Sequence, residues 1–339
     1  MKLDHPALID SAALPLIGPN GDNLLVVIAK GTFTFHSGRS EPAEEVIPIA
    51  YGDLFDDDIG AIRYESDILP PKPRTDIILC ASAYAPGGKP TQSVAVALKV
   101  GKVEKRIMVF GDRFWNYAGV LSRTYAITAT KPFTQRPIVY EDAFGGIDAI
   151  TGQYCAENLV GKGFYTVTSK HHLAGKPLPC IEDPRHLIRH INDRPPPVGF
   201  GVYNRAWQPR AAYAGTYDQS WRKGRCPLPP KDFDARFYNS AHPDLQADGY
   251  LQGNEAVVLS NLTPEGSTVF HLPNVTLFCQ IAHRTDHKHE ENKIRRMNLD
   301  TLFIEPDKKH FCIVWRTAVS LIGFATTDIV QVTIGLKQG

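Results

Sequence analysis

The densest group of residues able to bind a metal lies in the stretch HRTDHKHEE. Its possible ligands are His283, His287, His289 and Glu290. Imidazole and carboxylate groups coordinate zinc, and in a helix His283 and His287 would share one face, so this stretch could support a metal-dependent hydrolase. However, it lies between two predicted strands, and its basic neighbours are Lys288, Lys293, Arg295 and Arg296. Because these charges would oppose a bound cation, we expect a solvated hairpin loop without metal.

The other residues that could do chemistry each have a simpler structural interpretation. No serine lies in a G-x-S-x-G motif. Asp232 and Asp234 could form a carboxylate pair, but Arg236 lies beside them, and a structural ion pair is the commoner arrangement. The glycine runs at 145–146 and 161–163 do not follow a strand and open a long helix, as a phosphate-binding loop would. We therefore expect no catalytic residue, no cofactor and no enzyme activity.

Residues 205–239 hold an unusual concentration of aromatic, arginine and aspartate side chains. Aromatic side chains bury large areas and arginine stacks on them, so a buried network of these residues could order backbone that has no β-ladder. On this interpretation Trp221 and Phe233 are largely buried, and nearby aspartates pair with arginine. Because tryptophan, tyrosine and arginine also dominate binding hot spots, a protein-binding surface is the alternative.

The composition predicts a globular protein of the cytoplasm. The chain has 339 residues, of which 43% are hydrophobic and 22% charged. Its formal charge of +1 gives no field that would steer it to nucleic acid or to an anionic membrane. No apolar run approaches the roughly 20 residues of a membrane span, and the N-terminus lacks the order of a signal peptide. The six scattered cysteines, without a C-x-x-C motif, are expected to be reduced.

Frequent proline and glycine predict strands and loops, with no helix longer than about 15 residues. Alternating apolar residues around Gly101-Lys102 predict a hairpin, and a turn at 305–308 predicts another. Short helices are expected after Asp183-Pro184 and after Thr216, where the residues match N-terminal capping patterns.

The expected fold is mainly β, with two β-rich, sandwich-like lobes around an irregular Pro- and Gly-rich centre that holds a few short helices. The lobes span residues 1–111 and 248–339, and the centre spans 112–247. The three parts could also form one integrated domain. The regular βαβ alternation of a dinucleotide-binding or barrel enzyme is absent from the sequence.

The stretch at 200–246, here named the signature segment, resembles the central signature of a bacterial family of uncharacterised proteins encoded beside type VI secretion genes. The resemblance continues through VVIAKGTFTF, YEDAFGGID, GYLQGNEAVVLSNLTPEG and LDTLFIEPDKKHFCIVWR, and so covers nearly the whole chain. His242 departs from the smaller residue expected at its position. The candidate partner-binding or structural residues are Arg205, Trp207, Pro209, Arg210, Tyr217, Asp218, Trp221, Asp232, Phe233, Asp234, Arg236, Phe237 and Asn239.

The resemblance implies an adaptor or chaperone that binds a toxic type VI effector and helps to load it on a VgrG or PAAR spike protein. It implies no catalytic role for the signature residues, and neither nucleic acid nor membrane as a partner. Two alternatives stay open: a metal-dependent hydrolase that uses the histidine cluster at 283–290, and a structural component of the secretion particle.

Overall fold

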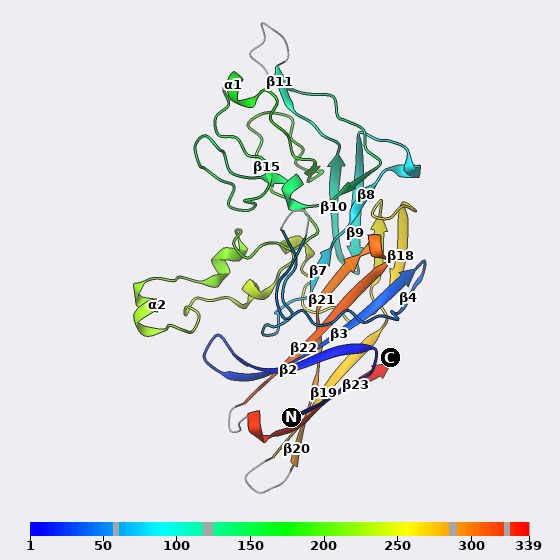
Figure 1. Cartoon of the computed structure of the whole chain (residues 1–339), viewed down its shortest axis with the longest axis vertical. Helices are drawn as coiled ribbons and strands as arrows, with labels where there is room; N and C mark the ends of the chain where they lie inside the picture. The colour runs from blue at the N-terminus through cyan, green and yellow to red at the C-terminus, as the bar shows by residue number, and fades with distance from the viewer. Residues whose placement is uncertain (57–60, 118–124, 285–289, 322–325, 339) are drawn as a thin grey trace.

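The computed structural model describes residues 1–56, 61–117, 125–284, 290–321 and 326–338. Strands hold 43% of the residues and helices 10%, which confirms the mainly β fold. Figure 1 shows the long strands gathered in the lower and right-hand parts of the molecule, with the irregular centre of the chain above them and to the left. Within the described ranges, no helix is long and apolar enough to cross a membrane.

Most strands belong to three sheets. The six-stranded sheet consists of β2 (Ile9–Ile17), β3 (Asn23–His36), β22 (His310–Ser320), β21 (Asn298–Glu305) and β7 (Asp76–Leu79), with β4 (Arg39–Pro42) also on β3. The five-stranded sheet consists of β16 (Ile181–Glu182), β10 (Val103–Phe110), β9 (Ser93–Val100), β17 (Ala256–Ser260) and β18 (Ser267–His271). The four-stranded sheet consists of β1 (Lys2–Asp4), β23 (Ile329–Gln338), β19 (Val275–Arg284) and β20 (Glu290–Arg296).

The remaining elements are short. Four strand pairs stand apart from the large sheets: β5 (Leu54–Phe55) with β6 (Ile62–Tyr64), β8 (Ser82–Tyr84) with β13 (Gln135–Pro137), β11 (Trp115–Tyr117) with β12 (Tyr125–Ile127), and β14 (Phe144–Gly145) with β15 (Lys162–Gly163). The α-helices are α1 (Lys170–Leu173) and α2 (Gln219–Gly224). The 3₁₀ turns are η1 (Pro86–Gly88), η2 (Tyr140–Asp142), η3 (Arg210–Ala214), η4 (Ala235–Tyr238), η5 (Pro243–Leu245), η6 (Pro306–Lys308) and η7 (Thr326–Asp328).

Each of the three large sheets combines strands from both ends of the chain. β3 pairs with β22 over most of its length, β9 pairs with β17, and β1 pairs with β23. The central stretch adds β16 to the edge of the five-stranded sheet. Residues 1–111 and 248–339 therefore share sheets instead of forming one separate lobe each, because their strands satisfy one another's backbone hydrogen bonds.

Two hairpins have the strands that the sequence predicts. β9 and β10 join through Gly101 and Lys102, and Gly101 has the positive φ of 55° that a two-residue turn requires. The buried face of β9 consists of Val94, Val96, Leu98 and Val100. β21 and β22 join through the turn that begins at Pro306, with Lys309 in the left-handed region.

An aromatic stack holds the six-stranded sheet against the five-stranded sheet. Phe35 on β3 stacks on Phe270 of β18, with ring centroids 4.4 Å apart. Phe311 on β22 stacks on both Phe270 and Phe33, at 5.3 and 5.4 Å. All four rings are buried, so they form the main core between these sheets.

The helix expected after Asp183-Pro184 is not formed, because residues 183–194 make turns. Side-chain carboxylates take the backbone N–H groups that a helix would have used. Glu182 accepts a hydrogen bond from the N–H of Ile188, and Asp193 accepts two more, all at 2.7–2.8 Å. The prediction was wrong because residues that cap a helix can also compete with it.

The helix expected after Thr216 is present as α2, although its cap differs. Asp218 is the N-cap, and its carboxylate accepts a hydrogen bond from the N–H of Trp221 at 2.8 Å. The Thr216 hydroxyl instead donates to Asp232 at 2.7 Å. α2 ends before Pro227, as the proline predicts.

Candidate functional site

The signature segment divides into a buried base and an exposed projection. Figure 1 shows α2 far to the left of the sheets, at the tip of two irregular segments that leave the body of the protein side by side. We name residues 215–232 the projection. Its two ends are tied where the N–H and hydroxyl of Thr216 donate to Asp232, at 3.0 and 2.7 Å. The segment therefore has a part packed in the body and a part that is exposed to solvent.

The structure sorts the signature residues by exposure. Three are buried: Trp207, Arg210 and Asn239. Four are half-buried: Trp221, Phe233, Asp234 and Phe237. Six are exposed: Arg205, Pro209, Tyr217, Asp218, Asp232 and Arg236. Trp221 and Phe233 are less buried than the sequence predicts. Trp221 lies on the projection, which offers little protein to cover it, and Phe233 packs only against Phe237 and Tyr238 among the described rings.

Arg210 fixes the base of the segment through a buried ion pair. Its guanidinium donates to both carboxylate oxygens of Glu65, at 2.8 and 2.7 Å. It also donates to the backbone oxygens of Tyr203 and Phe237, at 2.7 and 3.0 Å. Because one side chain links three separate parts of the chain, Arg210 orders backbone that has no β-ladder of its own.

Trp207 lies in an aromatic cluster beside that ion pair. Its ring meets the rings of Tyr140 and Tyr203 edge to face, with centroids 5.1 and 5.3 Å apart. Tyr140 and Tyr203 are in the same geometry with each other, at 5.8 Å. All three side chains are buried. Edge-to-face contacts of this kind favour one arrangement of the rings, so the base of the signature segment is well ordered.

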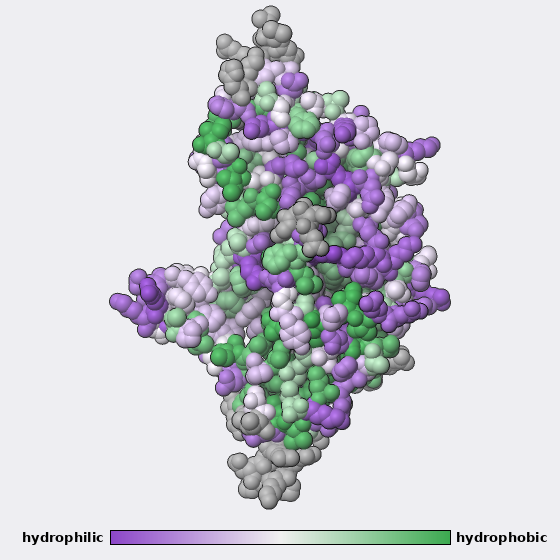
Figure 2. Space-filling model, viewed as in Figure 1, coloured by the Kyte–Doolittle hydropathy of each residue, from purple (hydrophilic) through white to green (hydrophobic). Residues whose placement is uncertain are grey.

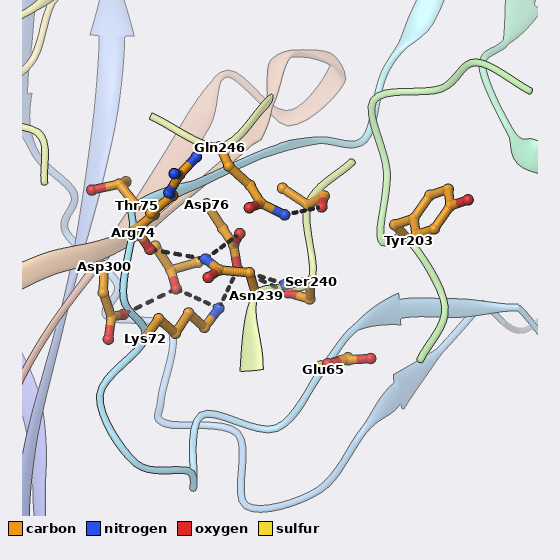
Figure 3. A network of polar contacts seen from close by, with 12 residues as sticks. Glu65, Lys72, Arg74, Thr75, Asp76, Tyr203, Asn239, Ser240, Gln246 and Asp300 are labelled. Atoms are coloured by element: carbon orange, nitrogen blue, oxygen red, sulfur yellow. Dashed lines mark hydrogen bonds and ion pairs between the residues drawn. The ribbon is translucent and has the colours of Figure 1, made fainter. Parts of the chain in front are cut away.

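A second buried network fixes the far end of the segment, as Figure 3 shows. Asn239 donates to the carboxylate of Asp76 at 2.9 Å, and the N–H of Ser240 donates to it at 2.8 Å. Lys72 completes the network by donating to Asp76 at 2.7 Å and to Thr301 at 2.9 Å. A buried carboxylate with this many partners is satisfied, so the network is structural.

The projection carries an aromatic pair at its helix. The rings of Tyr217 and Trp221 meet at 4.6 Å and an angle of 70°. The indole N–H of Trp221 donates to the backbone oxygen of Leu228 at 2.8 Å, which folds the end of the projection back on α2. Tyr217 is 56% exposed, an unusual position for a large aromatic side chain. Exposed aromatic residues on an ordered support are typical of binding surfaces.

The end of the projection is also cationic. Arg222 and Lys223 are exposed there on α2, and Lys231 is exposed at the base of the projection, beside Asp232. Residues 219–231 contain no acidic residue. Figure 2 shows this end in purple, the colour of hydrophilic residues. Arg225 instead braces the projection, because its guanidinium donates to the backbone oxygen of Pro19 in the turn between β2 and β3, at 2.8 Å.

The aspartates of the signature have local hydrogen-bond partners. Asp234 binds the guanidinium of Arg236 and caps η4, which confirms an aspartate–arginine pair in this segment. The Arg236 hydrogen bond holds the pKa of Asp234 below its usual value. Asp232 accepts from Thr216, and these hydrogen bonds likewise lower its pKa. Neither carboxylate has the raised pKa of a general acid.

A cleft of about 510 Å³ opens beside the base of the signature segment. Trp207 forms part of its wall, together with residues of the β5–β6 hairpin, the 137–141 stretch and the turn at 305–308. No local pattern in the sequence indicates this cleft, because its walls come from stretches far apart in the chain. Two of those stretches, YEDAFGGID and LDTLFIEPDKKH, were noted only for the family resemblance.

The possible nucleophiles in the cleft are held as neutral groups. Burial raises the pKa of Cys80 to about 11, and its thiol donates to the backbone oxygen of Arg63 at 3.8 Å. The Ser82 hydroxyl donates directly to Asp307 at 3.0 Å. Because the thiolate is the nucleophilic form of cysteine, the raised pKa makes Cys80 a weak nucleophile.

Two of the four predicted metal ligands, His287 and His289, lie outside the described residues. His283 is buried on β19. Among the described residues, no group of three or more histidine, cysteine or acidic side chains has the arrangement of a metal site.

The two glycine runs serve close backbone packing. β14 pairs with β15, which places Gly146 against the backbone of Gly161. A Cβ on Gly146 would lie 2.4 Å from the oxygen of Gly161, and Gly146 has a φ of 99°. Any other residue would be strained there, so the glycines have a structural role.

A family model described as "Uncharacterized protein conserved in bacteria (DUF2169)" matches residues 20–316. The match covers most of the chain, including the whole signature segment, and the chain belongs to this bacterial family. Comparisons with curated proteins and with solved structures give no match.

Proposed function

We propose that this protein is a cytoplasmic adaptor that binds a type VI secretion effector and helps to load it on a VgrG or PAAR spike protein. The observation that carries the proposal is the projection, an exposed segment with an aromatic pair and three cations on a base fixed by buried ion pairs. The class of the client comes from the resemblance of the signature segment to proteins encoded beside type VI secretion genes.

The anchoring of the projection supports a role in binding. Arg210 and Asn239 fix the chain on either side of it, and Arg225 braces it against the body. A segment that is ordered before it meets a partner loses less conformational entropy on binding, so more of the contact energy appears as affinity. Tyr217 and Trp221 provide the aromatic contact area that dominates most protein interfaces.

The chemistry of an effector waiting for secretion fits such a binder. A toxin held for loading exposes apolar surface, and a protein that binds its folded form shifts the client towards that form by mass action. The cations at the end of the projection favour a client with an acidic patch, because opposite charges speed association and fix the orientation of the complex.

Co-expression of a tagged copy with the effector and spike proteins encoded beside it tests the proposal. We expect both to be retained on the tag, and the soluble level of the effector to rise. The variant R222E/K223E/K231E should lose most of the effector, whereas the control K89E/K102E/K176E should keep it. The control makes the same change in charge at exposed lysines outside the projection.

Two results would count against the adaptor function. One is that neither the effector nor the spike protein is retained by the wild-type protein. The other is that deletion of the gene leaves the abundance and secretion of the effector unchanged.

A further inference from the structure

The lining of the cleft carries more negative than positive charge. Its charged residues are Asp56, Arg63, Glu141, Glu305, Asp307 and Lys308. Four of these are acids and two are bases, although the whole chain has a formal charge of +1. The cleft is therefore a local acidic feature on a nearly neutral protein, and it disfavours anionic ligands such as nucleic acid or acidic lipid.

The two cations of the cleft share one carboxylate. Arg63 forms an ion pair with the buried carboxylate of Glu305, and the Lys308 ammonium lies 3.2 Å from the same carboxylate. Asp307 accepts hydrogen bonds from Ser82 and Tyr84, which are neutral donors. Among the described residues, no lysine, arginine or histidine forms an ion pair with Asp307, and the lining as a whole keeps four acids against two bases.

Glu141 is the second carboxylate of the rim without a cation. It is half-buried, and no described lysine, arginine or histidine forms an ion pair with it. Burial is the largest influence and raises its pKa; the charges of Asp142 and Asp56 raise it as well, and the charge of Lys162 lowers it. A cation from outside would stabilise the charged form of such a half-buried carboxylate.

Apolar side chains border the same opening. Phe55 is 57% exposed and Val160 is 48% exposed, and both line the cleft. Deeper in the cleft, Ile138 and Trp207 present buried apolar surface. Exposed apolar side chains beside a hollow mark a place where a partner covers them, because their exposure to water is unfavourable.

The walls of the cleft are rigid. Trp207 is fixed by its contacts with Tyr140 and Tyr203. Asp307, another residue of the lining, is held by the Ser82 and Tyr84 hydroxyls at 3.0 and 2.7 Å. A cleft of this size with fixed walls can accept a side chain without first being rearranged.

We propose that the cleft binds a short extended segment of a partner protein in which a large apolar side chain lies next to a lysine or arginine. The apolar side chain enters between Phe55 and Val160 and packs towards Trp207. The cation pairs with Glu141 and Asp307 at the rim. The inference rests on the proposed adaptor function for the identity of the partner, but the chemistry of the segment follows from the cleft itself.

Selection from a random dodecapeptide display library on the immobilised wild-type protein tests the inference. We expect peptides with an apolar residue beside lysine or arginine to be enriched. Binding of the enriched peptide, measured by fluorescence anisotropy, should weaken about tenfold or more in Glu141→Lys, which places a cation at the rim. Phe55→Ser should also weaken it, because the mouth loses apolar area.

Two matched variants control for general effects of the substitutions. Glu44→Lys reverses the charge of an exposed glutamate and is the control for Glu141→Lys. Ile150→Ser replaces an apolar side chain that is 55% exposed and is the control for Phe55→Ser. Neither residue lines the cleft, and both variants should bind the peptide within about twofold of the wild type. When the immobilised protein is the Glu141→Lys variant, the same selection should enrich fewer basic and more acidic peptides.

The inference is overturned if no peptide is enriched, if the enriched peptides are not basic and apolar, or if Glu141→Lys and Phe55→Ser bind them as the wild type does. This outcome is separate from that of the adaptor experiment, because the peptide selection uses the protein alone. If the effector is retained but such peptides are not enriched, peptide binding in the cleft is refuted and the adaptor function is still supported.

Discussion

Replacing Arg210 by methionine should strongly destabilise the protein, whereas replacing Arg205 by alanine should not. Both arginines pair with Glu65, but in different surroundings. The Arg210 and Glu65 side chains are 6% and 7% exposed and share two hydrogen bonds, at 2.7 and 2.8 Å. The Arg205 side chain is 44% exposed and reaches the same carboxylate at 3.3 Å. Burial is therefore the main difference between the two ion pairs.

The expected magnitudes follow from that difference. Removal of one partner of a buried ion pair leaves the other charge uncompensated and costs about 3–5 kcal/mol. Arg205 still compensates Glu65 in part, so we expect Arg210→Met to lower the free energy of unfolding by about 3 kcal/mol. Arg205→Ala should lower it by less than about 1 kcal/mol, because solvent screens exposed pairs. The double variant R210M/E65Q leaves no buried charge and should cost less than the sum of its single changes.

Urea unfolding monitored by tryptophan fluorescence at pH 7 measures these differences. The m-value should stay constant across the variants, which would show that the change lies in stability and not in the extent of unfolding. Equal losses for Arg210→Met and Arg205→Ala would refute the reasoning, because burial would then have no role. Additive costs of R210M and E65Q would refute the coupling between the two side chains.

Three further predictions concern other parts of the molecule. Burial lowers the pKa of Lys105 from 10.5 to about 8, so the folded state binds this proton less tightly than the unfolded state does. Lys105→Met should therefore raise the free energy of unfolding by about 2 kcal/mol below pH 8. Urea unfolding should show this gain disappear as the pH rises towards 10.5. Trp221→Ala should cost only about 1–2 kcal/mol, less than for a core aromatic, because the side chain is half-buried, and a loss of 3–5 kcal/mol would contradict its place on the projection. The purified protein should contain no stoichiometric zinc by mass spectrometry, whereas near-unit zinc that is lost on His287→Ala would favour a hydrolase.

Local patterns in the sequence predicted the elements whose backbone partners lie close by. The hairpin of β9 and β10 was predicted because apolar residues alternate on both sides of a two-residue turn. The two strands are neighbours in the sequence, so each finds its hydrogen-bond partners close by. The hairpin of β21 and β22 was found from its proline-containing turn. The helix expected at 183–194 failed because the carboxylates of Glu182 and Asp193 compete for the same N–H groups, and a sequence does not show which partner prevails.

The sequence by itself determined the mainly β class, the two hairpins and the unusual character of the signature segment, because these depend on residue types and short spacings. Only the tertiary structure decided that β3 pairs with β22 and that Glu65 is the partner of Arg210, since both contacts join residues far apart in the chain. It also separated a buried Trp207 from a half-buried Trp221 only 14 residues later. Burial depends on what the rest of the chain places around a side chain, and no pattern within the segment records it.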